Sequence, residues 1–308
     1  MIKVFRIKKI LKLIIFLMTC SAFAQQDPQF TQYMYNTLSI NSGYTGQRDA
    51  ISAVILYRNQ WVGLDGAPQT QTLGIHGPLR NDALGLGLSI VNDIIGPTNE
   101  TYLNGNFSYT IFVDDYLTEL SFGLNAGLHI LNNDWTKGNF RQEGDPLFSD
   151  NINLTSPMIG AALYLHSENY YVGFSVPNFL KTEHYDTFKK SLATERMHFY
   201  LIGGYVFDIN RNLKLKPAFL AKAVSGAPII ADISLNALVN EKVHFGLSYR
   251  WDDSFSGLVG FNINQDLFIG YAHDRTTTGL SGYNYGTHEI MMRYEFMKNR
   301  RVISPRFF

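Results

Sequence analysis

Apolar and polar side chains alternate with a period of two residues along much of this chain. Between residues 102 and 111 the odd positions carry Leu103, Gly105, Phe107, Tyr109 and Ile111, while the even positions are mostly polar. The same pattern returns in residues 119–130, 243–251 and 289–296. Successive side chains of a β-strand point to opposite faces, so each segment predicts a strand with one apolar and one polar face.

Fourteen segments show this signature or a weaker form of it, and no apolar stripe with the period of a helix competes with them. We expect strands at residues 50–60, 69–77, 83–92, 100–113, 118–130, 157–165, 170–176, 197–207, 213–221, 229–238, 243–251, 257–263, 267–273 and 287–297.

The connections between these segments alternate in length. The links after the even strands are short, for example 114–117 and 239–242, whereas 132–156 and 177–196 are the longest. Outer-membrane barrels have short periplasmic turns at one end and longer loops at the other. An even number of strands then places both chain ends on the periplasmic side. The short link at 252–256 departs from this rhythm.

The first 24 residues predict export. Five basic residues precede an apolar run at 13–18, and Ala22-Phe23-Ala24 supplies small residues before Gln25. This pattern is typical of a secretory signal peptide, cleaved here between Ala24 and Gln25. A membrane-anchoring helix is the alternative, but the apolar run is shorter than the roughly 20 residues that a bilayer requires.

After cleavage no stretch is long enough for a transmembrane helix, yet aromatic residues make up 14% of the chain. A sheet of this width must close on itself in lipid, because an open edge leaves unpaired backbone groups there. We therefore expect an all-β fold, a transmembrane antiparallel β-barrel of about 14 strands in contact with outer-membrane lipid. A soluble protein of several β-sandwich domains is the main alternative, although it would lack the rhythm of long and short links.

Charge and candidate chemistry narrow the function. Removing the five basic residues of 1–24 from the 26 leaves 21 basic against 26 acidic residues, which gives no support for nucleic-acid binding. Cys20, the single cysteine, would leave with the signal peptide. Catalytic motifs are lacking, the histidines lack metal-ligand spacing, and the acid pairs at 114–115 and 252–253 are typical of turns. We expect no enzyme, cofactor or metal site.

Two arginines beside aromatic residues are candidates for partner binding. Arg58 precedes Trp61, and Arg250 lies between Tyr249 and Trp251. Arginine and aromatic side chains are common anchors of protein interfaces. The alternative is that the aromatic residues form the girdle of a barrel at the membrane surface and the arginines face the lumen.

The last expected strand carries three charges on one face, Glu289, Arg293 and Glu295. A charge facing lipid would cost roughly 2–4 kcal/mol, so we expect all three to face the lumen. There they form a polar ladder that is either purely structural or in contact with a plug.

Several motifs resemble the PorP/SprF family, and together they cover nearly all of the chain beyond the signal peptide. They are residues 27–36, 57–63, 68–70, 144–146, 171–178, 198–200, 216–217, 247–251, 288–291 and 304–308. One departure is Asn41-Ser42-Gly43-Tyr44, where the family has Asn-Pro-Ala-Tyr. The first motif adds Asp27, Phe30 and Tyr33 to the partner-binding candidates.

The resemblance implies an outer-membrane barrel of the type IX secretion and gliding-motility machinery of Bacteroidota. It implies help in secreting, or attaching to the cell surface, cargo with a C-terminal sorting domain, and contact with periplasmic proteins of the machine. A passive porin or small-molecule transporter is the alternative function. The expected organisation is a signal peptide (1–24), a periplasmic or lumenal arm (25–49) or a disordered lead-in, a barrel (50–297) and a periplasmic tail (298–308).

Overall fold

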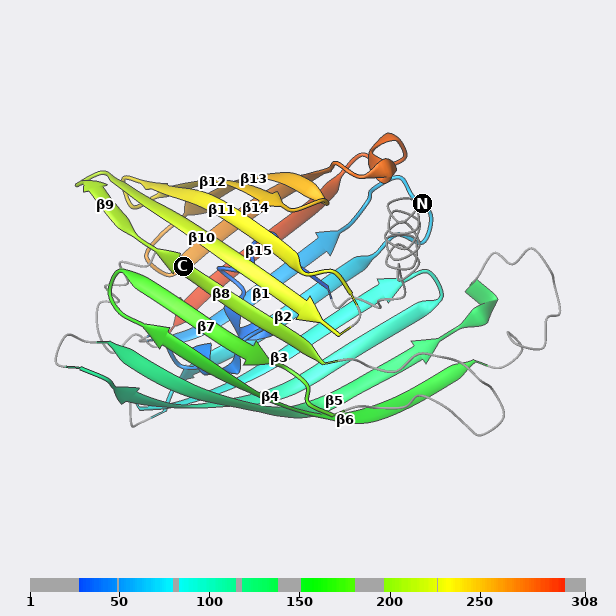
Figure 1. The fold of residues 1–308 in the computed structure, drawn as a ribbon, viewed down its shortest axis with the longest axis horizontal. Coiled ribbons are helices and arrows are strands. Elements are labelled where there is room, and N and C mark those ends of the chain that lie inside the picture. Colours follow the sequence, from blue (N-terminus) through cyan, green and yellow to red (C-terminus); the bar gives the residue numbers. More distant parts are fainter. Residues whose placement is uncertain are drawn as a thin grey trace, which may run out of the picture.

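The computed structural model describes residues 28–48, 50–79, 83–114, 118–137, 151–180, 197–225 and 227–296. The expected cleavage site at Ala24 and Gln25, together with Asp27 and the tail 298–308, lies outside these ranges. Within them, the strands form one antiparallel sheet whose last strand pairs with its first, so that the sheet closes into a ring (Figure 1). The strands are β1 (Ile51–Asn59), β2 (Gln69–Pro78), β3 (Leu84–Ile95), β4 (Thr98–Phe112), β5 (Glu119–Asn133), β6 (Ile152–His166), β7 (Tyr170–Val176), β8 (His198–Tyr205), β9 (Phe207–Asn210), β10 (Leu213–Val224), β11 (Ile230–Val239), β12 (Val243–Arg250), β13 (Ser254–Asn262), β14 (Leu267–Thr276) and β15 (Thr287–Phe296).

These segments occupy fourteen positions around the ring, because β8 and β9 are two parts of one strand. The register with β10 continues across Val206, from Gly204 opposite Ala218 to Phe207 opposite Leu215, and shifts only at the end of β9. The prediction of an antiparallel barrel of about 14 strands is therefore confirmed. The largest difference is at β6, which begins at Ile152, five residues before the expected start.

The two faces of each strand separate as the alternation predicts. On β15, Ile290 and Tyr294 are exposed on the outside of the ring, whereas Glu289 and Met291 point inward and are fully buried. Apolar side chains thus face lipid and polar side chains face the lumen, as in transmembrane barrels. No helix within the described ranges is long and apolar enough to cross a bilayer.

One part of the wall extends beyond the rest. Strands β4, β5 and β6 each have 15 residues, whereas β12 to β15 have 8 to 10. Figure 1 shows the β3–β6 sheet projecting past the other strands at the end that carries the long links. Its outer face changes from Leu128 to Asn132, which lies between Asn99 and Asn153 on the neighbouring strands. Because amide side chains are unfavourable in lipid, we expect the lipid-facing band to end below these asparagines and the extension to lie in water.

The interior of the ring is filled by the chain that precedes β1. We call residues 28–48 the lumenal strap. It contains turns and two short 3₁₀ helices, η1 (Thr37–Ser39) and η2 (Ser42–Tyr44). From residue 30 to residue 45 nearly every side chain is buried, and Tyr33, Tyr35 and Tyr44 join the largest hydrophobic cluster of the barrel. The other short helices, η3 (Trp135–Lys137) and η5 (Gly279–Gly282), lie in links.

Candidate functional site

The lumenal strap crosses the barrel from one end to the other. Its amino-terminal part contacts Asp274 and Glu289, each two residues from the end of β14 or β15 that flanks the link 277–286. Its carboxyl-terminal part reaches His76 and Glu295, near the opposite ends of β2 and β15. We call the first end the loop mouth and the second the turn end. The strands β1 and β15 begin and end at the turn end, as an even strand count predicts, but Pro28 lies toward the loop mouth.

Three charged side chains hold the strap at the loop mouth. Arg58 of β1 stands directly opposite Glu289 of β15 and forms an ion pair with it, and its Nη1 lies 2.9 Å from Oδ2 of Asp274. Each of the three side chains is no more than 4% exposed. A buried carboxylate needs both a counter-charge and hydrogen-bond donors, and one arginine supplies only part of this for two acids.

The strap supplies three further donors. The backbone N–H groups of Thr31 and Gln32 donate to the two oxygens of Glu289, at 2.7 and 3.0 Å. The hydroxyl of Thr31 donates to Oδ1 of Asp274 at 2.7 Å. Hydrogen bonds to a charged acceptor are about twice as strong as neutral ones. We call this arrangement of Arg58, Asp274, Glu289 and the two strap residues the latch.

The middle of the strap packs against the polar face of several strands. The ring of Tyr35 stacks on Phe268 with centroids 5.0 Å apart, and its hydroxyl lies 3.1 Å from Nδ1 of His244. On the other side of the lumen, the hydroxyl of Ser175 donates to the carbonyl of Ile40 at 2.6 Å.

At the turn end the strap is fixed by backbone and side-chain contacts. Arg48 forms an ion pair with Glu295, and the N–H of Gly46 donates to Nδ1 of His76 at 2.9 Å. The amide of Gln47 donates to the hydroxyl of Thr110 at 2.8 Å. Within three residues the chain then enters β1, so this end is also held covalently.

Two wall glycines allow the strap backbone to touch the barrel. A Cβ atom on Gly123 of β5 would lie 2.1 Å from the backbone nitrogen of Gly43, and one on Gly85 of β3 would lie 2.3 Å from the carbonyl oxygen of Thr45. A larger residue at either position would collide with main chain, which cannot move aside as a side-chain tip can. Gly85 and Gly123 thus form a seat for the strap, a part of the wall where its backbone can lie directly against the strands.

The strap occupies the lumen and covers polar side chains of the wall. Polar side chains that face it from five strands are fully buried, namely Ser52, Ser108, Ser121, Lys216 and Glu289, each 0% exposed. Side chains that line a water-filled channel remain in contact with water. The described structure is thus a barrel filled by its own chain.

The residues singled out from the sequence fall into three groups. Arg58 belongs to the latch, and Phe30 and Tyr33 are buried in the strap. Arg250 faces inward and lies 3.3 Å from carboxylate oxygens of both Asp232 and Asp253. The others lie at the loop mouth, where Trp251 is 70% exposed beside Tyr249, and Trp61 stands in the β1–β2 link with a positive φ of 49°.

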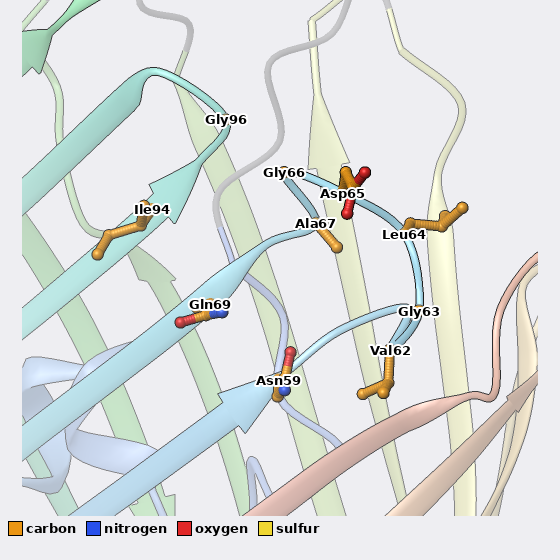
Figure 2. A pocket seen from close by; sticks show the side chains of 10 residues that line it. All are labelled: Asn59, Val62, Gly63, Leu64, Asp65, Gly66, Ala67, Gln69, Ile94 and Gly96. Atoms are coloured by element: carbon orange, nitrogen blue, oxygen red, sulfur yellow. The ribbon is translucent and has the colours of Figure 1, made fainter. Parts of the chain in front are cut away.

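The β1–β2 link also forms one side of a cleft at the loop mouth, with a volume of about 370 Å³ (Figure 2). The backbone of Gly63 to Ala67 arches over it, and the N–H of Gly96 donates to the carbonyl of Gly66 at 3.0 Å. Gly66 and Gly96 both have positive φ, a backbone conformation that glycine adopts without strain. The cleft offers the carboxylate of Asp65 and the amides of Asn59 and Gln69.

Sequence reasoning missed three members of the latch, Asp274, Thr31 and Gln32. Asp274 was assigned to the link after the expected strand 267–273, whereas β14 continues to Thr276. Thr31 lies in a segment without periodicity, and its partner is 243 residues away. Among the described residues, no group of three or more His, Cys, Asp or Glu side chains is arranged to hold a metal ion.

The closed sheet, the apolar outer face and the polar, filled interior define an outer-membrane β-barrel. A family model described as type IX secretion system membrane protein PorP/SprF matches residues 22–294, so the chain belongs to this family. No curated protein matches the chain. Among solved structures, the CymD monoaromatic hydrocarbon channel is 12% identical, with a TM-score of 0.52, over 90% of this chain and 96% of that one. Omp33 of Acinetobacter baumannii is also 12% identical, with a TM-score of 0.43, over 82% and 100% of the two chains. At this identity the likeness to CymD concerns the fold alone.

Proposed function

We propose that this barrel serves the type IX secretion and gliding-motility machinery by docking secreted cargo that carries a C-terminal sorting domain, and by contacting periplasmic proteins of the machine. Membership of the PorP/SprF family supports this function, because that family consists of membrane proteins of the secretion system. The docking would help to export the cargo or to attach it to the cell surface.

The filled lumen favours the docking role over the function of a passive porin. Five wall side chains from different strands are fully buried against the strap. A pore for small solutes requires a continuous water path, and the strap occupies its place at mid-barrel. A barrel closed in this way is suited to hold partners at its two ends, where loops and turns on a rigid scaffold carry recognition.

Deletion of the gene tests the proposal. The expected result is loss of sorting-domain cargo from the cell surface or the medium with unchanged uptake of small solutes, restored by the intact gene. Altered solute uptake with normal secretion would instead favour the porin. A tagged chain recovered from outer membranes should bring sorting-domain cargo and periplasmic machine proteins with it.

Single substitutions then address the candidate anchors. Trp61→Ala and Trp251→Ala alter aromatic side chains at the loop mouth, and Phe261→Ala removes an outward aromatic ring near the turn end as a matched control. If the loop mouth binds cargo, the first two variants recover less cargo than the control. Equal recovery of cargo with all three variants would show that these tryptophans do not anchor it.

A further inference from the structure

The two ends of the lumenal strap are held in different ways. At the turn end the strap continues through residues 49 and 50 into β1, so it cannot leave the barrel there. At the loop mouth it is held through non-covalent bonds, and the polar ones converge on the carboxylates of Asp274 and Glu289. Any movement of the strap out of the lumen must therefore begin at the loop mouth, where Thr31 and Gln32 are bonded to the wall.

The wall behind the strap carries charged side chains that water could hydrate if the strap left the lumen. It buries Arg58, Lys216, Asp232, Asp274 and Glu289, where a permanent plug would be packed most simply with apolar side chains. Removing such charges from water costs free energy that their ion pairs only partly offset. Water entering the lumen would hydrate these groups, so the wall lowers the cost of losing the strap.

We propose that the lumenal strap is a gate that opens from the loop mouth. The latch breaks when the N–H groups of Thr31 and Gln32 leave Glu289 and the hydroxyl of Thr31 leaves Asp274. The first part of the strap then swings outward, while Gly46 and Arg48 keep the other part at the turn end. The closed state is the one seen in the structure, and the open state has a water path through the barrel.

The gate makes a prediction for the smallest change to the latch. Thr31→Val removes one hydroxyl donor and leaves all three charged wall residues in place, so the barrel itself should fold normally. A hydrogen bond to a charged group is worth about a tenfold change in an equilibrium. Purified Thr31→Val barrels in planar lipid bilayers should therefore conduct ions for about ten times as large a fraction of the time as the unaltered chain.

A reversible lock provides the decisive experiment. The chain has one cysteine, Cys20, so Thr31→Cys with Asp274→Cys introduces a pair at positions whose side chains touch in the structure. The reduced pair lacks the latch bond and should conduct, and oxidation should close the same molecules. Gln47→Cys with Thr110→Cys is the matched lock at the turn end, and oxidising it should leave conductance unchanged. The proposal is overturned if oxidation of the first pair has no effect, or if the second lock closes the barrel equally well.

Discussion

Arg58 on the first strand faces Glu289 on the last strand, directly across the seam where the barrel closes. The two residues are 231 positions apart in the sequence and form a fully buried ion pair. The same carboxylate accepts hydrogen bonds from two backbone N–H groups of the strap, those of Thr31 and Gln32. The Glu289 side chain therefore joins the two strands of the seam and also holds the strap.

Replacing Arg58 should destabilise the barrel strongly. Arg58→Ala leaves Asp274 and Glu289 buried side by side without the arginine that both contact, and breaking a buried ion pair in this way costs about 3–5 kcal/mol. The measurement is the midpoint of thermal unfolding in detergent, followed by the mobility of unheated samples on gels. Arg275→Ala, at an exposed position one residue beyond Asp274, is the control and should unfold at the wild-type midpoint. Equal midpoints for both variants would contradict the role given to the latch.

A methyl group on the strap's seat should loosen the strap without opening the barrel wall. In Gly123→Ala the added Cβ would meet the backbone of Gly43, and overpacking of this kind costs about 1–3 kcal/mol. Protease should then cleave within the strap faster than in the unaltered protein, while the strands stay protected. Gly257→Ala adds the same group where no atom lies within 4 Å, and its cleavage should match the wild type. Equal cleavage of the two variants would show that the close approach does not seat the strap.

The period of two was sufficient to predict the strands, because lipid on one side and a polar interior on the other impose opposite demands on successive residues. On β15 it predicted both the outward Ile290 and the inward Glu289. It also left open whether the charged ladder meets a plug. The structure answers this at Glu289, which binds the strap.

The strap itself was beyond prediction from periodicity. Its polar residues lack a period because it is built of turns and 3₁₀ helices that meet a curved polar wall on all sides. The same composition is also typical of a disordered lead-in. Contacts with distant strands distinguish the two, such as that of Thr31 with Asp274, 243 residues away, and no local pattern encodes such a contact.

The limits of the lipid-facing band can be tested by placing an arginine at two outward positions, one near the middle of the barrel wall and one on its extension. Leu247 points outward near the middle of β12 and is 72% exposed, so Leu247→Arg should lose roughly 2–4 kcal/mol of folding free energy in bilayers. Asn132 points outward on the extension of β5, and Asn132→Arg should cost less than about 1 kcal/mol there. Reversible folding into lipid vesicles measures both. Similar costs would place the extension within the membrane.

The direction of the strap can be tested by labelling intact cells. Pro28 is half-buried at the loop mouth and Gln47 is half-buried at the turn end. Long loops on outer-membrane barrels face the cell exterior, so Pro28→Cys should react with a membrane-impermeant maleimide added to whole cells, and Gln47→Cys should react only after the outer membrane is broken.

Asp65→Cys in the β1–β2 link and Glu241→Cys in the β11–β12 turn, both exposed, establish the orientation of the barrel independently of the strap. If Asp65→Cys reacts on whole cells and Pro28→Cys does not, the barrel is oriented as proposed and the strap enters from the other end. If Glu241→Cys reacts instead, the orientation itself is wrong. The labelling thus distinguishes a wrong strap direction from a wrong barrel orientation. Reaction of Asp65→Cys and Pro28→Cys on whole cells, without Glu241→Cys and Gln47→Cys, places the amino-terminal end of the strap at the cell surface, where the latch must open.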